Sequence, residues 1–147
     1  MIRLGLCCIF KNEPIKFRRT TAAYLSRQPR AGQLARLSDL CLQNADALME
    51  ALRYCRDQNI GSFRVNSQIL PLKTHPEAGY DIIDLPASEQ IVTAFKACGT
   101  FAARHHIRTT FHPDQFIVLN SPNDSVIERS VTDLIYQAEV AGWIGAM

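Results

Sequence analysis

The sequence lacks several features that define whole classes of protein. No apolar stretch approaches the ~20 residues that a helix needs to cross a bilayer, so we expect no membrane segment. The five cysteines are an odd number, form no C-x-x-C pair and follow no signal peptide. These absences predict a reduced, cytoplasmic protein without a disulfide framework. We expect Cys41, Cys55 and Cys98 to be small residues of the core.

Net charge is also small, at +2 with the histidines neutral, and by itself it hardly indicates a nucleic-acid partner. The basic residues are unevenly distributed, because residues 16–36 carry no acidic residue. Such a cluster can follow a phosphate backbone, and it can equally be a solvated loop. Its members are Lys16, Arg18, Arg19, Arg27, Arg30 and Arg36.

Hydrophobic residues make up 47% of the 147 residues, which is enough for one globular domain over 1–147. Short apolar runs alternate with amphipathic segments along the chain. Gly61 is placed to cap the end of one helix, and Ser88 to cap the start of another. The predicted strands cover 2–8, 62–66 and 107–111, and the predicted helices cover 20–27, 34–58, 88–104 and 125–141.

This alternation of strands and helices predicts an α/β fold with a parallel sheet and right-handed crossovers. Long polar segments follow the strands, while the helix-to-strand returns are very short. That asymmetry favours a TIM (β/α)8 barrel, although a doubly wound sheet would show a similar one. A closed barrel needs about 250 residues. We therefore expect 1–147 to hold the first three β/α units, the N-terminal part of a single barrel domain.

Two histidines, His75 and His112, lie in loops that follow predicted strands, and each precedes a proline. Proline restricts the preceding residue to extended backbone, which helps to aim each imidazole. Their common face makes them candidate metal ligands, and hydrogen bonding at the sheet rim is the alternative. His105 and His106 lie at the opposite face, where we expect contacts with a helix end or with solvent.

Gln115 and Phe116 follow His112 on the same loop. An aromatic ring beside an amide can enter a duplex and fill the space of displaced bases. Taken alone, a phenylalanine more often packs inward. The position of the pair between a strand ending at His112 and a helix starting near Ser125 predicts exposure instead.

Several motifs together resemble the UV damage endonucleases, in the same order along nearly the whole chain. The resemblance implies a TIM barrel related to endonuclease IV and the xylose-isomerase-like enzymes. It also implies a cluster of divalent metals, typically Mn²⁺. The implied activity is an endonuclease that nicks damaged double-stranded DNA on the 5′ side of UV photoproducts. No obligate protein partner is evident. The matching segments are 1–6, 63–67 with 70–71, 74–76, 111–116, 119–122 and 128–130.

Carried over by the resemblance, His75 and His112 hold one metal, while Gln115 and Phe116 are the probe pair at the lesion. Leu6 and the cysteines after it depart from an aromatic and polar segment of some members. The family's carboxylate and remaining ligands have no counterpart in this sequence, so we expect no nicking by 1–147 alone. The alternatives are a catalytically inactive DNA-binding fragment and a sugar-isomerase-like barrel enzyme.

Overall fold

A parallel sheet of three strands lies at the centre of the computed structural model, which describes residues 3–7 and 9–146. The strands are β1 (Gly5–Leu6), β2 (Ser62–Val65) and β3 (Arg108–Phe111), in the order β1-β2-β3. Phe63 of β2 pairs with Leu6 and with Thr109. The predicted α/β class and parallel sheet are confirmed. Positions 2 and 8 of the predicted first strand lie outside the described residues.

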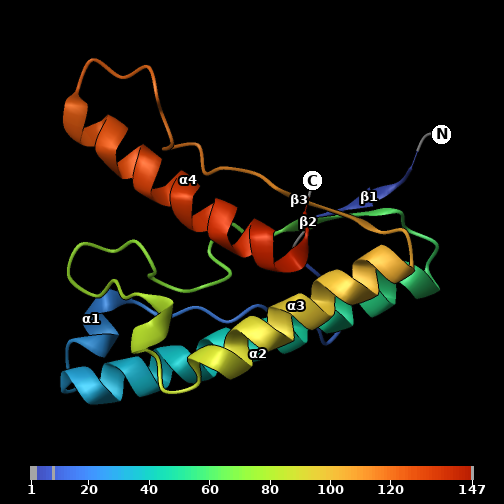
Figure 1. Ribbon diagram of the computed structural model, residues 1–147, viewed down its shortest axis with the longest axis horizontal. Helices are drawn as coiled ribbons and strands as arrows, with labels where there is room; N and C mark the ends of the chain where they lie inside the picture. Colours follow the sequence, from blue (N-terminus) through green and yellow to red (C-terminus); the bar gives the residue numbers. More distant parts are fainter. Residues whose placement is uncertain (1–2, 8, 147) are drawn as a thin grey trace.

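Helices connect these strands and cover the sheet. The short helix α1 leads into the long helix α2, and α3 and α4 follow β2 and β3 respectively. Figure 1 shows α2 and α3 running side by side below the sheet. The helix α4 begins far from the strands, at the upper left of the view, and ends beside them. Among the described residues, no helix is both long and apolar enough to span a membrane. The bounds are α1 Ala22–Leu25, α2 Arg30–Asp57, η1 Ile82–Asp84, α3 Ser88–Arg104 and α4 Asp124–Ile144.

The core lies between the sheet and the pair α2 and α3. Phe63 and Val65 alternate with half-buried positions of β2 and are themselves buried in the core. The rings of Phe10 and Phe17 stack on Phe63 at centroid distances of 6.2 and 6.4 Å. Core side chains from the two helices include Leu37, Cys41, Leu48, Leu52, Cys55, Ile91, Phe95 and Cys98.

The three core cysteines are buried, as predicted. Burial raises the pKa of Cys41 to about 11 and that of Cys98 to about 12, because a thiolate loses its hydration there. Both therefore stay protonated at neutral pH and serve as small apolar residues. Cys7, by contrast, is exposed.

Two predicted helix caps are wrong. The left-handed residue after α2 is Asn59, with φ 54°, and not Gly61, because asparagine tolerates this conformation. Gly61 instead joins the sheet, where its amide donates to Leu4 and its carbonyl accepts from Arg108. Ser88 lies inside α3, whose cap position is Ala87, and the amide of that alanine donates to the Ser38 hydroxyl of α2 at 3.1 Å.

Candidate functional site

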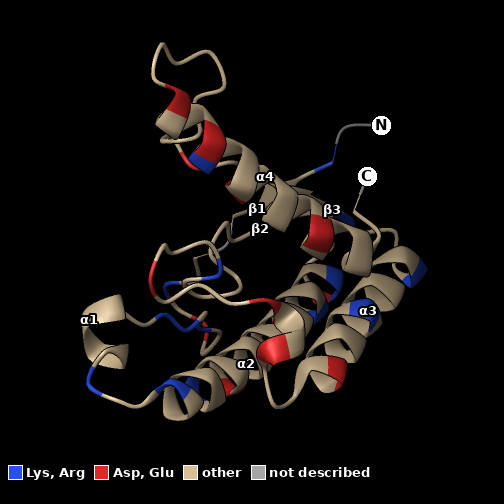
Figure 2. Ribbon diagram, turned by 60° about the vertical axis from the view of Figure 1, so that its left-hand side comes forward, with Lys and Arg blue, Asp and Glu red and all other residues tan. Residues whose placement is uncertain are grey.

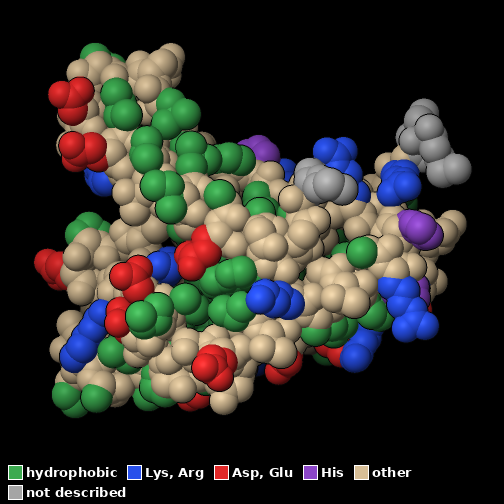
Figure 3. All heavy atoms as spheres, in the orientation of Figure 1, with side chains coloured by type: hydrophobic (Ala, Val, Ile, Leu, Met, Phe, Trp, Pro, Cys, Tyr) green, Lys and Arg blue, Asp and Glu red, His purple; other side chains and the backbone are tan. Residues whose placement is uncertain are grey.

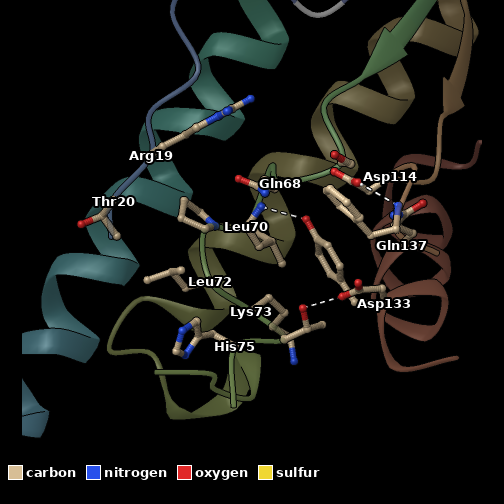
Figure 4. A pocket seen from close by; sticks show the side chains of 15 residues that line it. Arg19, Thr20, Gln68, Leu70, Leu72, Lys73, His75, Asp114, Asp133 and Gln137 are labelled. Atoms are coloured by element: carbon tan, nitrogen blue, oxygen red, sulfur yellow. Dashed lines mark hydrogen bonds between the residues drawn. The ribbon is translucent and has the colours of Figure 1, made fainter. Parts of the chain in front are cut away.

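Two adjoining pockets lie at the ends of the strands, and α4 lines one of them. The His75 pocket, of about 270 Å³, is lined by the loop after β2, by α4 and by the segment before α1. The His112 pocket, of about 310 Å³, is lined by the end of β2 and the loop after β3. Arg19, Ser67 and Asp114 line both pockets, so the two form one continuous surface. Figure 4 shows the His75 pocket with Arg19 and Asp114 reaching it from different segments.

His75 is half-buried and its imidazole is already engaged by its own turn. Its Nδ1 accepts the backbone amides of Glu77 at 3.2 Å and Ala78 at 3.1 Å. An Nδ1 that accepts hydrogen bonds leaves the proton of a neutral imidazole on Nε2. For Nε2 to bind a metal, that proton must move to Nδ1, and both amides then lose their acceptor.

His112 directly follows β3 and is exposed. In the described part of the chain its imidazole makes no hydrogen bond, so it is free to accept a ligand. His75 and His112 line separate pockets. Within residues 3–7 and 9–146, no three His, Cys, Asp or Glu side chains form a group that could hold a metal ion. The two histidines are therefore ligand candidates of the right chemical kind, but they do not form a closed site here.

Gln115 and Phe116 are both exposed, as their loop position predicts, and 76% of Phe116 is accessible. The inward-packed alternative for Phe116 is therefore wrong. The loop itself is held in place, because the Asp114 carboxylate accepts the Phe116 amide at 3.1 Å. Further along, the Val118 amide donates to the Ser130 hydroxyl of α4 at 2.9 Å. An apolar ring is thus presented to solvent by an anchored backbone.

The wall between the loop after β2 and α4 depends on Tyr136 and Asp133, which the sequence did not single out. The Tyr136 hydroxyl accepts the Leu70 amide at 3.0 Å, and Thr74 donates to the Asp133 carboxylate. Burial raises the pKa of Tyr136, so its hydroxyl stays protonated. These contacts attach the loop that carries His75 to the helix that follows the Phe116 loop. The sequence feature that indicates a buried position for Tyr136 is its helical spacing from Val140 on α4.

The basic cluster of residues 16–36 separates into different roles. Figure 2 shows basic positions on the chain leading into α1 and at the start of α2. Arg30 donates to the Gly79 carbonyl at 2.7 Å and so braces the turn after His75. Arg19 lines both strand-end pockets, whereas Arg27 lies exposed after α1. Only part of the cluster therefore faces the candidate site.

His105 and His106 lie at the opposite end of β3, as predicted. The His105 ring packs on Phe101 with centroids 4.4 Å apart. His106 adopts φ 56°, and its carbonyl accepts the Arg3 guanidinium at 2.9 Å. Their contacts are structural and remote from the strand-end pockets.

Comparison with known proteins gives one consistent result. The chain matches the family described as UV-endonuclease UvdE over residues 2–145. It is 31% identical to a UV DNA damage endonuclease of Bacillus cereus over 126 residues, which are 86% of this chain and 37% of that protein. It is 28% identical to a UV DNA damage endonuclease of Nostoc sp. over 143 residues, covering 97% of this chain and 43% of that one.

Among solved structures, the chain resembles the crystal structure of SacUVDE. The TM-score is 0.80 at 25% identity, and the match covers 99% of this chain and 47% of the other. The chain thus spans less than half the length of each of these relatives.

Proposed function

The chain belongs to the UvdE family of UV endonucleases, and from that premise we propose that it acts in DNA repair as part of an endonuclease that nicks DNA on the 5′ side of UV photoproducts. The observation that carries the proposal is the anchored loop after β3, where a free imidazole at His112 precedes the exposed ring of Phe116. A metal ligand and a stacking group on one loop suit an enzyme that recognises a lesion and cuts beside it.

The proposed architecture is a TIM barrel of which this chain provides the first three β/α units. Support comes from the parallel order β1-β2-β3 and from the position of both pockets at the strand ends. In barrels of this type, the loops after the strands build the active face.

For the metal, we propose that His75 and His112 are the ligands that this chain contributes to a divalent ion, with Mn²⁺ the expected one. His112 suits this role as it stands, whereas His75 requires the tautomer with a proton on Nδ1. A bound divalent ion would neutralise the phosphodiester and supply a hydroxide. Since the described residues contain no group of three His, Cys, Asp or Glu side chains that could hold a metal ion, we expect weak metal binding and no nicking by this chain alone.

Damaged double-stranded DNA is the proposed substrate, with Gln115 and Phe116 as the pair that enters the duplex at the lesion. The exposed ring supports this role, because stacking on bases needs a free face. The match to UV endonucleases favours this reading over a sugar isomerase. A DNA-binding role without hydrolysis is the second candidate, and the incomplete donor set favours it for this chain alone.

Binding to UV-irradiated duplex tests the proposed function. A labelled duplex with one thymine pair is irradiated, and its affinity for the chain is compared with that of the same duplex before irradiation, at fixed salt and with Mn²⁺ present. The proposal predicts tighter binding to the irradiated duplex. Equal affinity for both duplexes contradicts it.

The metal ligands are tested separately by the electron paramagnetic resonance signal of free Mn²⁺ during titration. We expect His75→Ala and His112→Ala each to weaken Mn²⁺ binding. His105→Ala is the matched control, because it removes an imidazole at the opposite end of β3. If His105→Ala weakens binding as much as His112→Ala does, the proposed ligands are wrong.

A further inference from the structure

Asn44 of α2 joins two segments of the candidate site from beneath. Its side chain is fully buried. Its oxygen accepts the Arg18 amide at 2.6 Å, and its nitrogen donates to the carbonyls of Arg18 at 3.0 Å and Ile69 at 2.8 Å. A buried amide with all these bonds satisfied holds its partners in fixed positions. The segment before α1 and the loop after β2 are therefore fixed to the same point of α2.

Arg19 is the residue that this arrangement places between the pockets. It is exposed, and it lines the His75 pocket, the His112 pocket and a third pocket shared with Lys16 and Arg18. In the described part of the chain, the ion pairs involve other residues. The Arg19 guanidinium therefore keeps its N–H donors available for a ligand.

The surroundings of Arg19 favour an anion. The His112 pocket contains a second arginine, Arg64, and Gln115 beside it. Its carboxylate, Asp114, is engaged by the Phe116 amide at 3.1 Å. Two guanidinium groups face one carboxylate in this pocket, so positive charge is in excess. Such a pocket suits a phosphodiester, which guanidinium binds through two parallel hydrogen bonds.

We propose that Arg19 binds a backbone phosphate of the DNA where the two pockets meet, and that Asn44 is a positioning residue that holds Arg19 there. The inference rests on the proposed function, since it takes DNA as the ligand. It adds a contact that is independent of the lesion, because a phosphate is present in damaged and undamaged DNA alike.

The test uses the 147-residue chain and a labelled duplex, both irradiated and unirradiated, titrated by fluorescence anisotropy over a salt series. The slope of log K against log salt is negative, and loss of one phosphate contact lowers its magnitude by about one. We expect Arg19→Gln to lower the slope by that amount and the affinity roughly tenfold at low salt, equally for both duplexes. Arg27→Gln is the matched control, from the same basic stretch but outside the strand-end pockets, and should leave the slope unchanged.

Asn44→Ala should lower the slope as Arg19→Gln does, in protein shown to be folded by circular dichroism. The double variant should show no greater loss of slope than Arg19→Gln alone, because Asn44 acts through Arg19. Equal slopes for Arg19→Gln and Arg27→Gln, or no binding of either duplex by the unaltered chain, would overturn the inference. A slope change specific to Arg19 without any preference for the irradiated duplex supports the inference while the proposed lesion recognition fails.

Discussion

The helix layer beneath the sheet and the loops at the strand ends are built on opposite principles. Leu48 and Leu52 of α2 and Phe95 of α3 are completely buried, and their spacing alone predicts their helices. His112, Gln115 and Phe116 are exposed on a loop that hydrogen bonds hold in place. Stability therefore resides in the layer, and the groups available to a ligand reside in the loops.

The helix α4 has both buried and exposed apolar residues. Val140 and Ile144 are buried, whereas Val131 is 42% and Ile135 65% exposed. Figure 3 shows hydrophobic side chains gathered along this helix on the visible face. The exposed side of α2 carries charged and polar residues instead, such as Asp46 and Glu50. Because α4 packs on α3 as its main helix neighbour, that contact is a sensitive point.

The largest effect on stability is expected from Phe63→Ala. Phe63 is fully buried and carries the stacked rings of Phe10 and Phe17. Removing it should lower the free energy of unfolding by about 3–5 kcal/mol, measured by urea denaturation. A loss below about 1 kcal/mol would show that the sheet face is not part of the core.

A smaller loss should follow Gly99→Ala, where α3 meets the end of α4. A methyl group at Gly99 would lie 2.5 Å from the carbonyl oxygen of Ile144. We expect a destabilisation of about 1–3 kcal/mol. Gly142→Ala is the control, because nothing lies within 4 Å of its added methyl, and it should stabilise α4 by up to ~1 kcal/mol. If both variants stabilise the protein, α3 and α4 do not approach each other closely at Gly99.

Alkaline pH should weaken the core. The pKa of Cys41 is raised from 9.0 to about 11, so its contribution is complete below pH 9 and is lost as pH rises through 11. At pH 10 the loss should be about 1 kcal/mol, since the unfolded thiol is then largely ionised. The melting temperature of Cys41→Ala should fall less steeply between pH 8 and 10 than that of the unaltered chain. If the melting temperatures of the two proteins fall equally with pH, ionisation of the Cys41 thiol does not contribute to the loss of stability.

The sequence predicted the layer well because its signals are local. The predicted helix at 88–104 has the observed bounds. The helix α4 extends further than predicted at both ends, whereas α2 begins four residues earlier and ends one residue earlier than predicted. The start of α2 was missed because Pro29 stands at its cap position with no side-chain hydrogen bond. The 3-10 helix Ile82–Asp84 was also missed, although Asp81 and Asp84 form its capping box.

The site was predictable only in part, because its contacts join distant segments. Single-loop features such as the exposure of Phe116 followed from position along the chain. The Asn44 contacts join residues 26 and 25 positions away, and no local pattern reports such pairing. A polar residue at a buried helical spacing, seven after Leu37, was the one signal that could have found it. The roles of His75 and His112 as metal ligands stay predictions.

The smallest effect on stability and the most direct test of lesion recognition both come from Phe116. Because its ring is 76% exposed, Phe116→Ala should change the free energy of unfolding by less than about 0.5 kcal/mol. The deciding measurement is the ratio of affinities for irradiated and unirradiated duplex at fixed salt. Phe116→Ala should lower that ratio, because it removes about 1–3 kcal/mol of stacking from binding to the irradiated duplex. Phe116→Tyr should preserve the ratio, because the ring face remains. An unchanged ratio in Phe116→Ala, or a loss of stability in place of selectivity, would contradict the account.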